Sequence, residues 1–429
     1  MATIILFATF FGMLVIGVPI AFAMAGSSIV AMFALGLNPM PAVQNMLNAG
    51  NSSSLLAIPL FILAGDLMNR GGITPRLLDL AFALVGHIRG RLAQIDVVAS
   101  MFFGGVSGSS VADSAAIGSA LIPSMLKEGY SRGFSAALIG TAGTLGSIIP
   151  PSITMVILGV TGGVSIADLF LGGFVPGALI GLALCIYVYF YSIRHGLTKT
   201  ERFSWSRLGG ASVKAFVPAL SPAIIISGII GGVFTPTEAG AVAVVYSFIV
   251  GAFVYRELSA RAIFEALTET TVVTGFVAFM VFASASFGWV LTYERIPDFV
   301  ALQLLGKTSD PLIMFLLMNL VLLVMGTFLD PTPIIILTVP IFLPIALQLG
   351  IDPVHFGVVL TINMAIAQMT PPVGAVLFTT AGIARATMAE VVPPLLPFLA
   401  IMVGMLVLFT AFPGLVLFVP HLLAGKWAW

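Results

Sequence analysis

Charged residues are scarce in this chain: Asp, Glu, Lys and Arg together make up 8% of its 429 residues. Soluble domains carry about 25% charged residues, so a soluble globular protein is excluded. The 17 basic and 17 acidic residues cancel, and no basic run is interleaved with aromatic residues. A nucleic-acid-binding surface is excluded as well, because it requires a concentrated positive charge.

Cysteine and the common catalytic motifs are also lacking. The single cysteine, Cys185, lies inside an apolar run, which excludes a disulfide framework, and the four histidines share no metal-ligand spacing. No His-Glu-x-x-His, Gly-x-Gly-Asp or Walker sequence is present. An intramembrane hydrolase and an ATP-driven pump therefore have no motif to support them, and we do not expect an enzyme.

Apolar residues, in contrast, make up 59% of the chain, and the mean hydropathy is +1.15. A membrane helix needs about 20 mostly apolar residues, and such stretches recur along the whole sequence. The 45 glycines and 26 prolines predict broken or closely packed helices, as in transporters. We predict an all-α polytopic membrane protein with elements at 3–35, 52–68, 98–126, 134–160, 172–193, 217–233, 238–255, 271–292, 311–347, 354–380 and 393–419.

The basic residues predict the orientation in the membrane. Segment 194–216 carries five of them, and short loops rich in Lys and Arg stay in the cytoplasm. Tracing the elements from this loop places 14 of the 17 basic residues inside and leaves Arg295, Lys307 and Lys426 outside. The N-terminus is then predicted to be cytoplasmic and the C-terminus to lie on the other side.

Two elements begin and end on the same side of the membrane in this topology, so both are predicted to be re-entrant hairpins. Segment 98–126 enters from the cytoplasm and turns at 104–110, where Ser110 and Asp113 have the spacing of a capping box. Segment 311–347 enters from the opposite face and turns at 326–331, where Asp330 can cap the returning helix.

An internal repeat in the sequence supports the presence of two corresponding hairpins. A shift of 221 residues superposes Pro123, Pro150, Pro151 and Pro176 on Pro344, Pro371, Pro372 and Pro397. Matches at one fixed offset indicate duplicated units. Because the two hairpins enter from opposite faces, the copies have inverted topology, which is typical of secondary transporters.

A Pro-Pro pair breaks the helix that follows each hairpin, at 150–151 and at 371–372. Proline removes a helical hydrogen bond and frees carbonyl oxygens upstream, which suit a small hard cation. We therefore expect two sodium sites, each between a hairpin turn and a broken helix. Helix N-termini at the same turns would face an anionic substrate.

The candidate ligands follow from this arrangement. The first sodium site is predicted to comprise Gly105, Ser107, Ser109, Ser110, Gly146, Ile149 and Pro151. The second is predicted to comprise Gly326, Asp330, Ala367, Met369, Thr370 and Pro372. The predicted substrate contacts are Ser109, Asp113, Pro150, Pro331, Thr332 and Pro371. Helix capping and close packing stay open as alternative roles for the serines, the glycines and the two acids.

Several stretches resemble the large membrane subunit of tripartite ATP-independent periplasmic (TRAP) transporters, over essentially the whole chain. They are Ala57-Ile58-Pro59-Leu60-Phe61-Ile62-Leu63-Ala64-Gly65, Val106-Ser107-Gly108-Ser109-Ser110-Val111-Ala112-Asp113, Ile148-Ile149-Pro150-Pro151-Ser152-Ile153 and Thr235-Pro236-Thr237-Glu238-Ala239. One departure is Gly146-Ser147, where many relatives are expected to have Gly-Pro.

The resemblance implies a sodium-driven importer of an organic acid in the bacterial inner membrane. It also implies a small membrane subunit, a periplasmic substrate-binding protein, and an elevator movement of a transport domain against a scaffold. The expected division is: scaffold 1–68 and 217–292; inner and outer surface arms 69–97 and 293–310; transport domain 98–193 and 311–419; cytoplasmic loop 194–216; tail 420–429.

Two alternatives stay open. A stand-alone sodium-coupled carboxylate carrier would share the repeats and the ion sites but would need no binding protein. A proton-coupled carrier would need a titratable group in the central site, and Asp113 or Asp330 could serve. The identity of the organic acid does not follow from the sequence.

Overall fold

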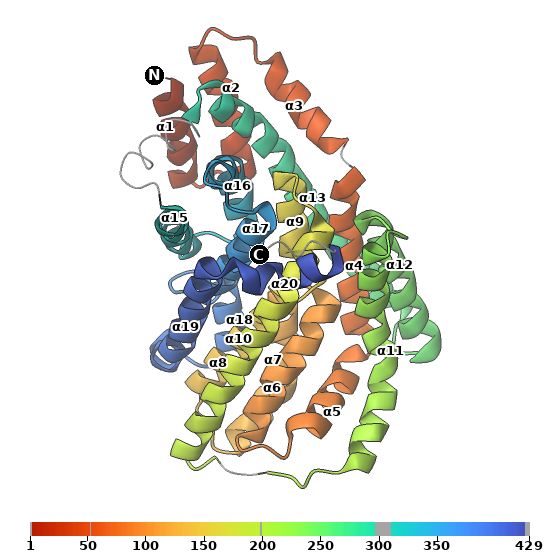
Figure 1. Ribbon diagram of the computed structural model, residues 1–429. Coiled ribbons are helices and arrows are strands. Elements are labelled where there is room, and N and C mark those ends of the chain that lie inside the picture. Colours follow the sequence, from red (N-terminus) through yellow and green to blue (C-terminus); the bar gives the residue numbers. More distant parts are fainter. Residues whose placement is uncertain (1, 52, 198–199, 297–309, 425–429) are drawn as a thin grey trace.

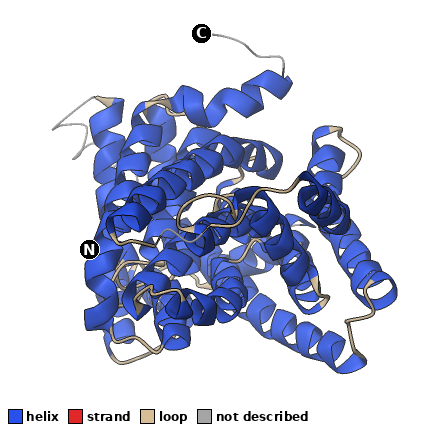
Figure 2. Ribbon diagram, turned by 90° about the horizontal axis from the view of Figure 1, so that it is seen from below, coloured by secondary structure: helices blue, strands red, loops and turns tan. Residues whose placement is uncertain are grey.

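The computed structural model describes residues 2–51, 53–197, 200–296 and 310–424. These residues form helices joined by short turns, and no strand occurs among them (Figure 2). Six of the described helices are long and apolar enough to cross a membrane. The chain is therefore a multi-pass membrane protein, as its composition predicts.

The helices follow one another along the chain with few long connections (Figure 1). The first part contains α1 (Ala2–Val15), α2 (Ile20–Ala34), α3 (Met40–Gly50), α4 (Ala57–Arg70), α5 (Ile73–Val85), α6 (Arg91–Ser107), α7 (Ser110–Lys127), α8 (Arg132–Gly143), α9 (Ile153–Gly162) and α10 (Ile166–Arg194). The second contains α11 (Trp205–Ile230), α12 (Pro236–Ile249), α13 (Ala260–Tyr293), α15 (Pro311–Gly326), α16 (Pro331–Gln348), α17 (Pro353–Ala367), α18 (Ala375–Ala384), α19 (Met388–Ala411) and α20 (Pro413–Ala424). Short 3-10 segments lie at Ser53–Leu56 and Thr144–Ser147, and a π-helical segment lies at Val250–Val254.

Helices α8 and α17 form the centre of the core. Every residue of α8 after Arg132 is buried, and so is every residue of α17 after Pro353. A helix that is apolar on all sides is stable only when other helices surround it. Ser131 caps α8 and Asp352 caps α17, and these two residues are related by the 221-residue shift.

Both predicted hairpins are present, but the first is longer than expected. Helices α15 and α16 match the predicted hairpin 311–347 closely. The first hairpin starts at Arg91 rather than at 98, so the predicted surface arm 69–97 is too long and only α5 remains in it. The reason is local: Gly90 has a φ of 74°, which ends the preceding turn, and Arg91 is bound by Glu128 and Glu201 instead of solvent.

The helices after the two turns have corresponding boundaries. Shifting α7 (Ser110–Lys127) by 221 residues gives the bounds of α16 (Pro331–Gln348). The shift also places α8 on α17, α9 on α18 and α10 on α19, with starts that agree within two residues. The two Pro-Pro peptide bonds, at 150–151 and 371–372, are both cis.

The N-terminal segment differs from the prediction in two ways. Residues 3–35 form two helices packed against each other, α1 and α2, because Gly17 and Pro19 interrupt the apolar run. Thr3 donates a hydrogen bond of 3.0 Å to Glu294, at the far end of α13 from Arg261. Helix α13 has 34 residues and is about 51 Å long, more than the roughly 30 Å of bilayer core. Thr3 and Arg261 therefore lie at opposite ends of this long helix, whereas the predicted topology places the N-terminus and Arg261 on the same side of the membrane.

Two other predicted boundaries also need correction. Helix α11 begins at Trp205, so Arg207 and Lys214 belong to a helix and the loop predicted at 194–216 is shorter. The apolar element 393–419 is two helices, because α19 ends at Ala411 and α20 begins at Pro413. The predicted outer arm 293–310 and the predicted tail 420–429 lie mostly outside the described residues.

Candidate functional site

A cavity of about 550 Å³ lies where the two hairpin turns meet. The turn between α6 and α7 and the turn between α15 and α16 form one side of it, together with the two broken-helix segments. Helices α4 and α13 form the other side. The polar lining residues are Asp66, Asn69, Ser107, Ser109, Ser110, Ser147, Thr154, Glu269, Thr270, Asp330, Thr332 and Gln368.

Four helices begin at this cavity. The first residues of α7, α9, α16 and α18 all line it: Ser110, Ile153, Pro331 and Ala375. The first turn of a helix has free N–H groups and a partial positive charge, so helix N-termini attract anions. The charged side chains on the described walls are acidic, and none of the lining residues is Lys or Arg. The partial positive charge on the described walls therefore comes from the helix N-termini.

The first hairpin turn brings a serine onto a buried carboxylate. Gly108 has a φ of 64°, a conformation that glycine adopts easily, and it ends α6. Ser109 is the N-cap of α7 and accepts from the Ala112 N–H. The predicted capping box of Ser110 and Asp113 is wrong, because the helix starts one residue after Ser109. Asp113 instead accepts a hydrogen bond from the Ser107 hydroxyl.

Asp113 is fully buried, and its Oδ2 atom has no hydrogen-bond partner among the described residues. That oxygen points at Gly146 of the first broken helix, where a Cβ would overlap it. A buried ionised carboxylate without a partner is unfavourable by several kcal/mol, so it needs a proton or a cation nearby. The Asp113 Oδ2 atom therefore lies beside the backbone of Gly146, which belongs to the predicted first sodium site.

The first broken segment lies directly behind this turn. Ser152 caps α9 and also donates to the Ser147 carbonyl oxygen, at 2.5 Å. A Cβ at Gly105 would lie 3.5 Å from the Pro150 carbonyl oxygen. These contacts place the first hairpin turn directly against the first broken segment. Ile149 is buried, and its side chain packs against Gly104 and Gly177.

The second hairpin turn is more open. Asp330 is the N-cap residue of α16, as predicted, but its side chain makes no capping hydrogen bond and is exposed. Pro331 occupies the first helical position, and Thr332 follows it on the cavity wall. Outside the cavity lining, Gly326 packs so closely on Ala367 that a Cβ at Gly326 would overlap the Ala367 methyl group.

The second broken segment resembles the first in position but differs in its side chains. The Thr370 hydroxyl donates to the Ile366 carbonyl oxygen at 2.8 Å, and Met369 is buried. Pro371 and Pro372 then separate α17 from α18. Gln368 lines the cavity at the position that corresponds, by the 221-residue shift, to Ser147.

The structure therefore divides the predicted site residues into two groups. Six of them line the cavity: Ser107, Ser109, Ser110, Asp330, Pro331 and Thr332. The others lie outside its lining. The sequence analysis missed Ser147 and Gln368, although the repeat offset relates them and could have identified the pair.

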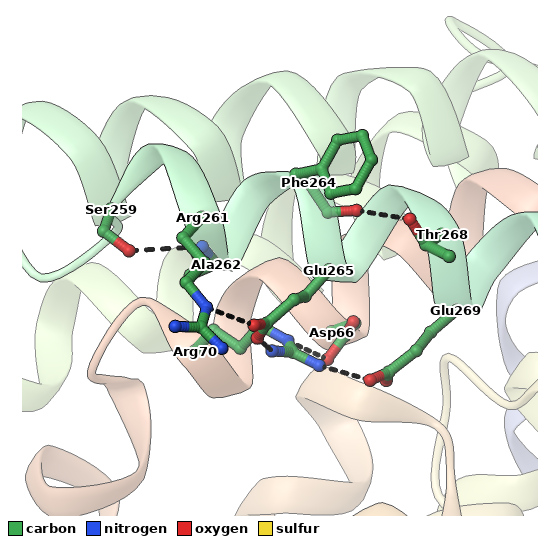
Figure 3. A network of polar contacts seen from close by, with 9 residues as sticks. All are labelled: Asp66, Arg70, Ser259, Arg261, Ala262, Phe264, Glu265, Thr268 and Glu269. Atoms are coloured by element: carbon green, nitrogen blue, oxygen red, sulfur yellow. Dashed lines mark hydrogen bonds and ion pairs between the residues drawn. The ribbon is translucent and has the colours of Figure 1, made fainter.

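The wall opposite the turns was also missed. Asp66 and Asn69 reach the cavity from α4, and Glu269 and Thr270 reach it from α13. Arg70 joins these two helices: it bonds to Asp66 at 2.9 Å, Glu265 at 2.9 Å and Glu269 at 2.8 Å (Figure 3). The four-residue spacing of Asp66 and Arg70 allows a pair within α4, but the contacts to α13 depend on the tertiary fold.

The sequence of this chain is similar to those of known transporter proteins. The model of the DctM component of tripartite ATP-independent periplasmic transporters matches residues 7–415. The C4-dicarboxylate TRAP transporter large permease protein DctM of Vibrio cholerae is 39% identical, over 99% of each chain. The isethionate TRAP transporter permease protein DctMQ of Oleidesulfovibrio alaskensis is 39% identical, over 96% of this chain and 66% of that protein.

A solved structure shares the fold. The YdaH transporter of Alcanivorax borkumensis superposes with a TM-score of 0.63 at 16% identity, over 87% of each chain. The family match covers nearly the whole chain, including both hairpins and both broken helices. The chain therefore belongs to the DctM family of tripartite ATP-independent periplasmic transporters, and it is a membrane permease rather than an enzyme.

Proposed function

We propose that this chain is the large permease subunit of a sodium-driven importer of a small organic anion in the bacterial inner membrane. It works with a small membrane subunit and a periplasmic substrate-binding protein, and it moves its cargo by an elevator mechanism. The observation that carries the proposal is the cavity on which four helix N-termini converge, with a buried, partly unpartnered carboxylate beside it.

The substrate class rests on the charge of that cavity. The partial positive charge at the N-termini of α7, α9, α16 and α18 favours a carboxylate or a sulfonate. The relatives named for C4-dicarboxylates and for isethionate act on small organic anions, which agrees with this charge. A cavity of about 550 Å³ has room for such a molecule.

Sodium coupling rests on the groups beside the helix ends. At the first site, Asp113 would supply a negative charge, and Ser107, Ser109 and the Gly146 backbone would supply neutral oxygens. At the second, Asp330 and the backbone near Ala367 and Thr370 would do the same. Oxygen-only sites of this kind suit a hard cation, and the cation would offset the repulsion between these acids and an anionic substrate.

The elevator and its inverted repeats rest on the corresponding helix boundaries and on the position of the cavity. The cavity touches α4 between Ile62 and Asn69, and α13 between Glu269 and Val277. It thus lies nearer to the Arg70 end of α4 and to the Ala260 end of α13, the ends predicted to be cytoplasmic. We interpret the structure as an inward-facing state. With Arg261 inside, Thr3 lies on the periplasmic side, so we propose a periplasmic N-terminus in place of the predicted cytoplasmic one.

A thermal-shift titration tests the sodium coupling. The melting temperature of the full chain in detergent is measured against sodium chloride, with potassium or choline chloride holding the ionic strength constant. A ligand that binds only the folded state stabilises it, so a saturable, sodium-specific rise is expected. A response to pH with no response to sodium would favour the proton-coupled carrier. Uptake by the reconstituted chain without a binding protein would favour the stand-alone carrier.

A further inference from the structure

Helix α4 approaches the first hairpin turn very closely at Gly65. A Cβ at this position would lie 2.7 Å from the Ser107 carbonyl oxygen, 3.2 Å from its Cα and 3.3 Å from its carbonyl carbon. All three are backbone atoms, which cannot rotate away as a flexible side chain can. A larger residue at 65 therefore requires the turn or α4 to move.

Ser107, the residue that α4 touches, is central to the first ion site. Its hydroxyl donates to the buried Asp113 carboxylate, and its backbone leads into Gly108. The Gly108 carbonyl oxygen accepts from the Ile153 N–H at 3.4 Å, where α9 begins after the Pro-Pro break. The turn is thus held between α4 on one side and the broken helix on the other.

Helix α4 cannot move easily away from the turn, because ion pairs join it to α13 next to this contact. Asp66 directly follows Gly65 and bonds to Arg70, which also bonds to Glu265 and Glu269 of α13 (Figure 3). One turn further on, a Cβ at Gly71 would lie 3.1 Å from the Gly251 Cα. The position of Gly65 is therefore determined by the scaffold helices and not by the hairpin.

We propose that Gly65 is a positioning residue that couples the scaffold to the first sodium site. This inference rests on the proposed function. Contact with α4 holds the Ser107 backbone in the conformation that the site requires, so sodium binding and docking of the turn on α4 favour each other. Coupling of this kind is reciprocal. Release of sodium weakens the docking, which frees the hairpin for its return movement.

The test compares Gly65→Ala with a matched control, Gly240→Ala. At Gly240 of α12, a Cβ would lie 2.9 Å from the Leu60 Cβ, so the control crowds the same helix α4 away from the hairpin turn. Sodium titrations of the melting temperature give the half-saturating concentration. We expect Gly65→Ala to raise it about fivefold or more. Gly240→Ala is expected to lower the melting temperature with an unchanged half-saturation.

A double variant assigns the effect to the first site. In an Asp113→Asn background, Gly65→Ala should cause little further change in half-saturation, because the carboxylate that Ser107 contacts is already removed. An equal fold-change in both backgrounds would overturn the inference. If the wild-type chain shows no sodium-specific response at all, the proposed function fails instead, so the two failures are distinguishable.

A second variant covers the case in which Gly65→Ala does not fold. Arg70→Gln releases the clamp between α4 and α13, whereas Arg261→Gln removes only a bond to Glu265, at 2.8 Å. Arg70→Gln should raise the half-saturating sodium concentration, and Arg261→Gln should not. Wild-type sodium binding in Arg70→Gln and in any folded Gly65→Ala protein would overturn the inference.

Discussion

The two hairpin turns occupy corresponding positions in the chain but have opposite environments. The first turn packs its backbone on α4 at Gly65 and buries the Asp113 carboxylate completely. At the second turn, the Phe328 side chain is 63% exposed, and Asp330 lies exposed at the cavity wall without a capping bond. The first turn is packed against α4, whereas the second turn is more exposed.

The difference originates in the scaffold rather than in the hairpins. By the 221-residue shift, Ser107 corresponds to Phe328, and Gly65 corresponds to Ser286 of α13. Ser286 is fully buried, and its hydroxyl has no hydrogen-bond partner in the described part of the chain. Under the proposed elevator mechanism, this asymmetry would correspond to one end state, and the other end state would bring the second turn onto α13.

The largest effect is expected from the acids of the two turns. Asp113→Asn should raise the half-saturating sodium concentration on the order of tenfold, because it removes the only carboxylate of the docked site at a cost of 1.4 kcal/mol or more, by rough estimate. Asp330→Asn should raise it less, because that acid is exposed and screened. Sodium titrations of the melting temperature measure both. Equal losses in the two variants would contradict the proposed difference between the turns.

A smaller effect is expected from the corresponding pair Ser107 and Phe328. Ser107→Ala leaves both oxygens of the buried Asp113 without a partner and should lower the free energy of unfolding by about 1–3 kcal/mol. Phe328→Ala removes an exposed side chain and should change it by less than about 0.5 kcal/mol. Thermal or denaturant unfolding in detergent measures both. A larger loss from Phe328→Ala would show that the second turn is packed rather than free.

The smallest effect on sodium binding is expected at Asp96, the second buried acid of the first hairpin. Neither of its carboxylate oxygens has a hydrogen-bond partner in the described structure, and it does not line the cavity. Asp96→Asn removes a buried charge without removing a bond, so it should keep or raise the melting temperature. It should leave the sodium half-saturation unchanged, in contrast to Asp113→Asn. A loss of sodium binding in Asp96→Asn would extend the ion site beyond the turn.

Local patterns in the sequence predicted both turns and the main breaks between helices. Apolar runs predict membrane helices, the prolines at 150–151 and 371–372 predict the breaks between α8 and α9 and between α17 and α18, and Asp330 followed by Pro331 predicts the start of α16. These features act within one helical turn, through caps and missing hydrogen bonds. The prediction of a boundary from charge fails at Arg91, which begins a buried helix because its side chain pairs with Glu128 and Glu201.

The sequence alone determined the class of protein, the two hairpins, the two broken helices and six of the residues that line the cavity. Only the tertiary structure decided which turn packs on α4, at which end of α13 the N-terminal helix lies, and which residues of α4 and α13 complete the cavity wall. The physical reason is distance along the chain. Gly65 and Ser107 are 42 positions apart, and Arg70 and Glu269 are 199 apart, so their contacts exist only after the helices have packed.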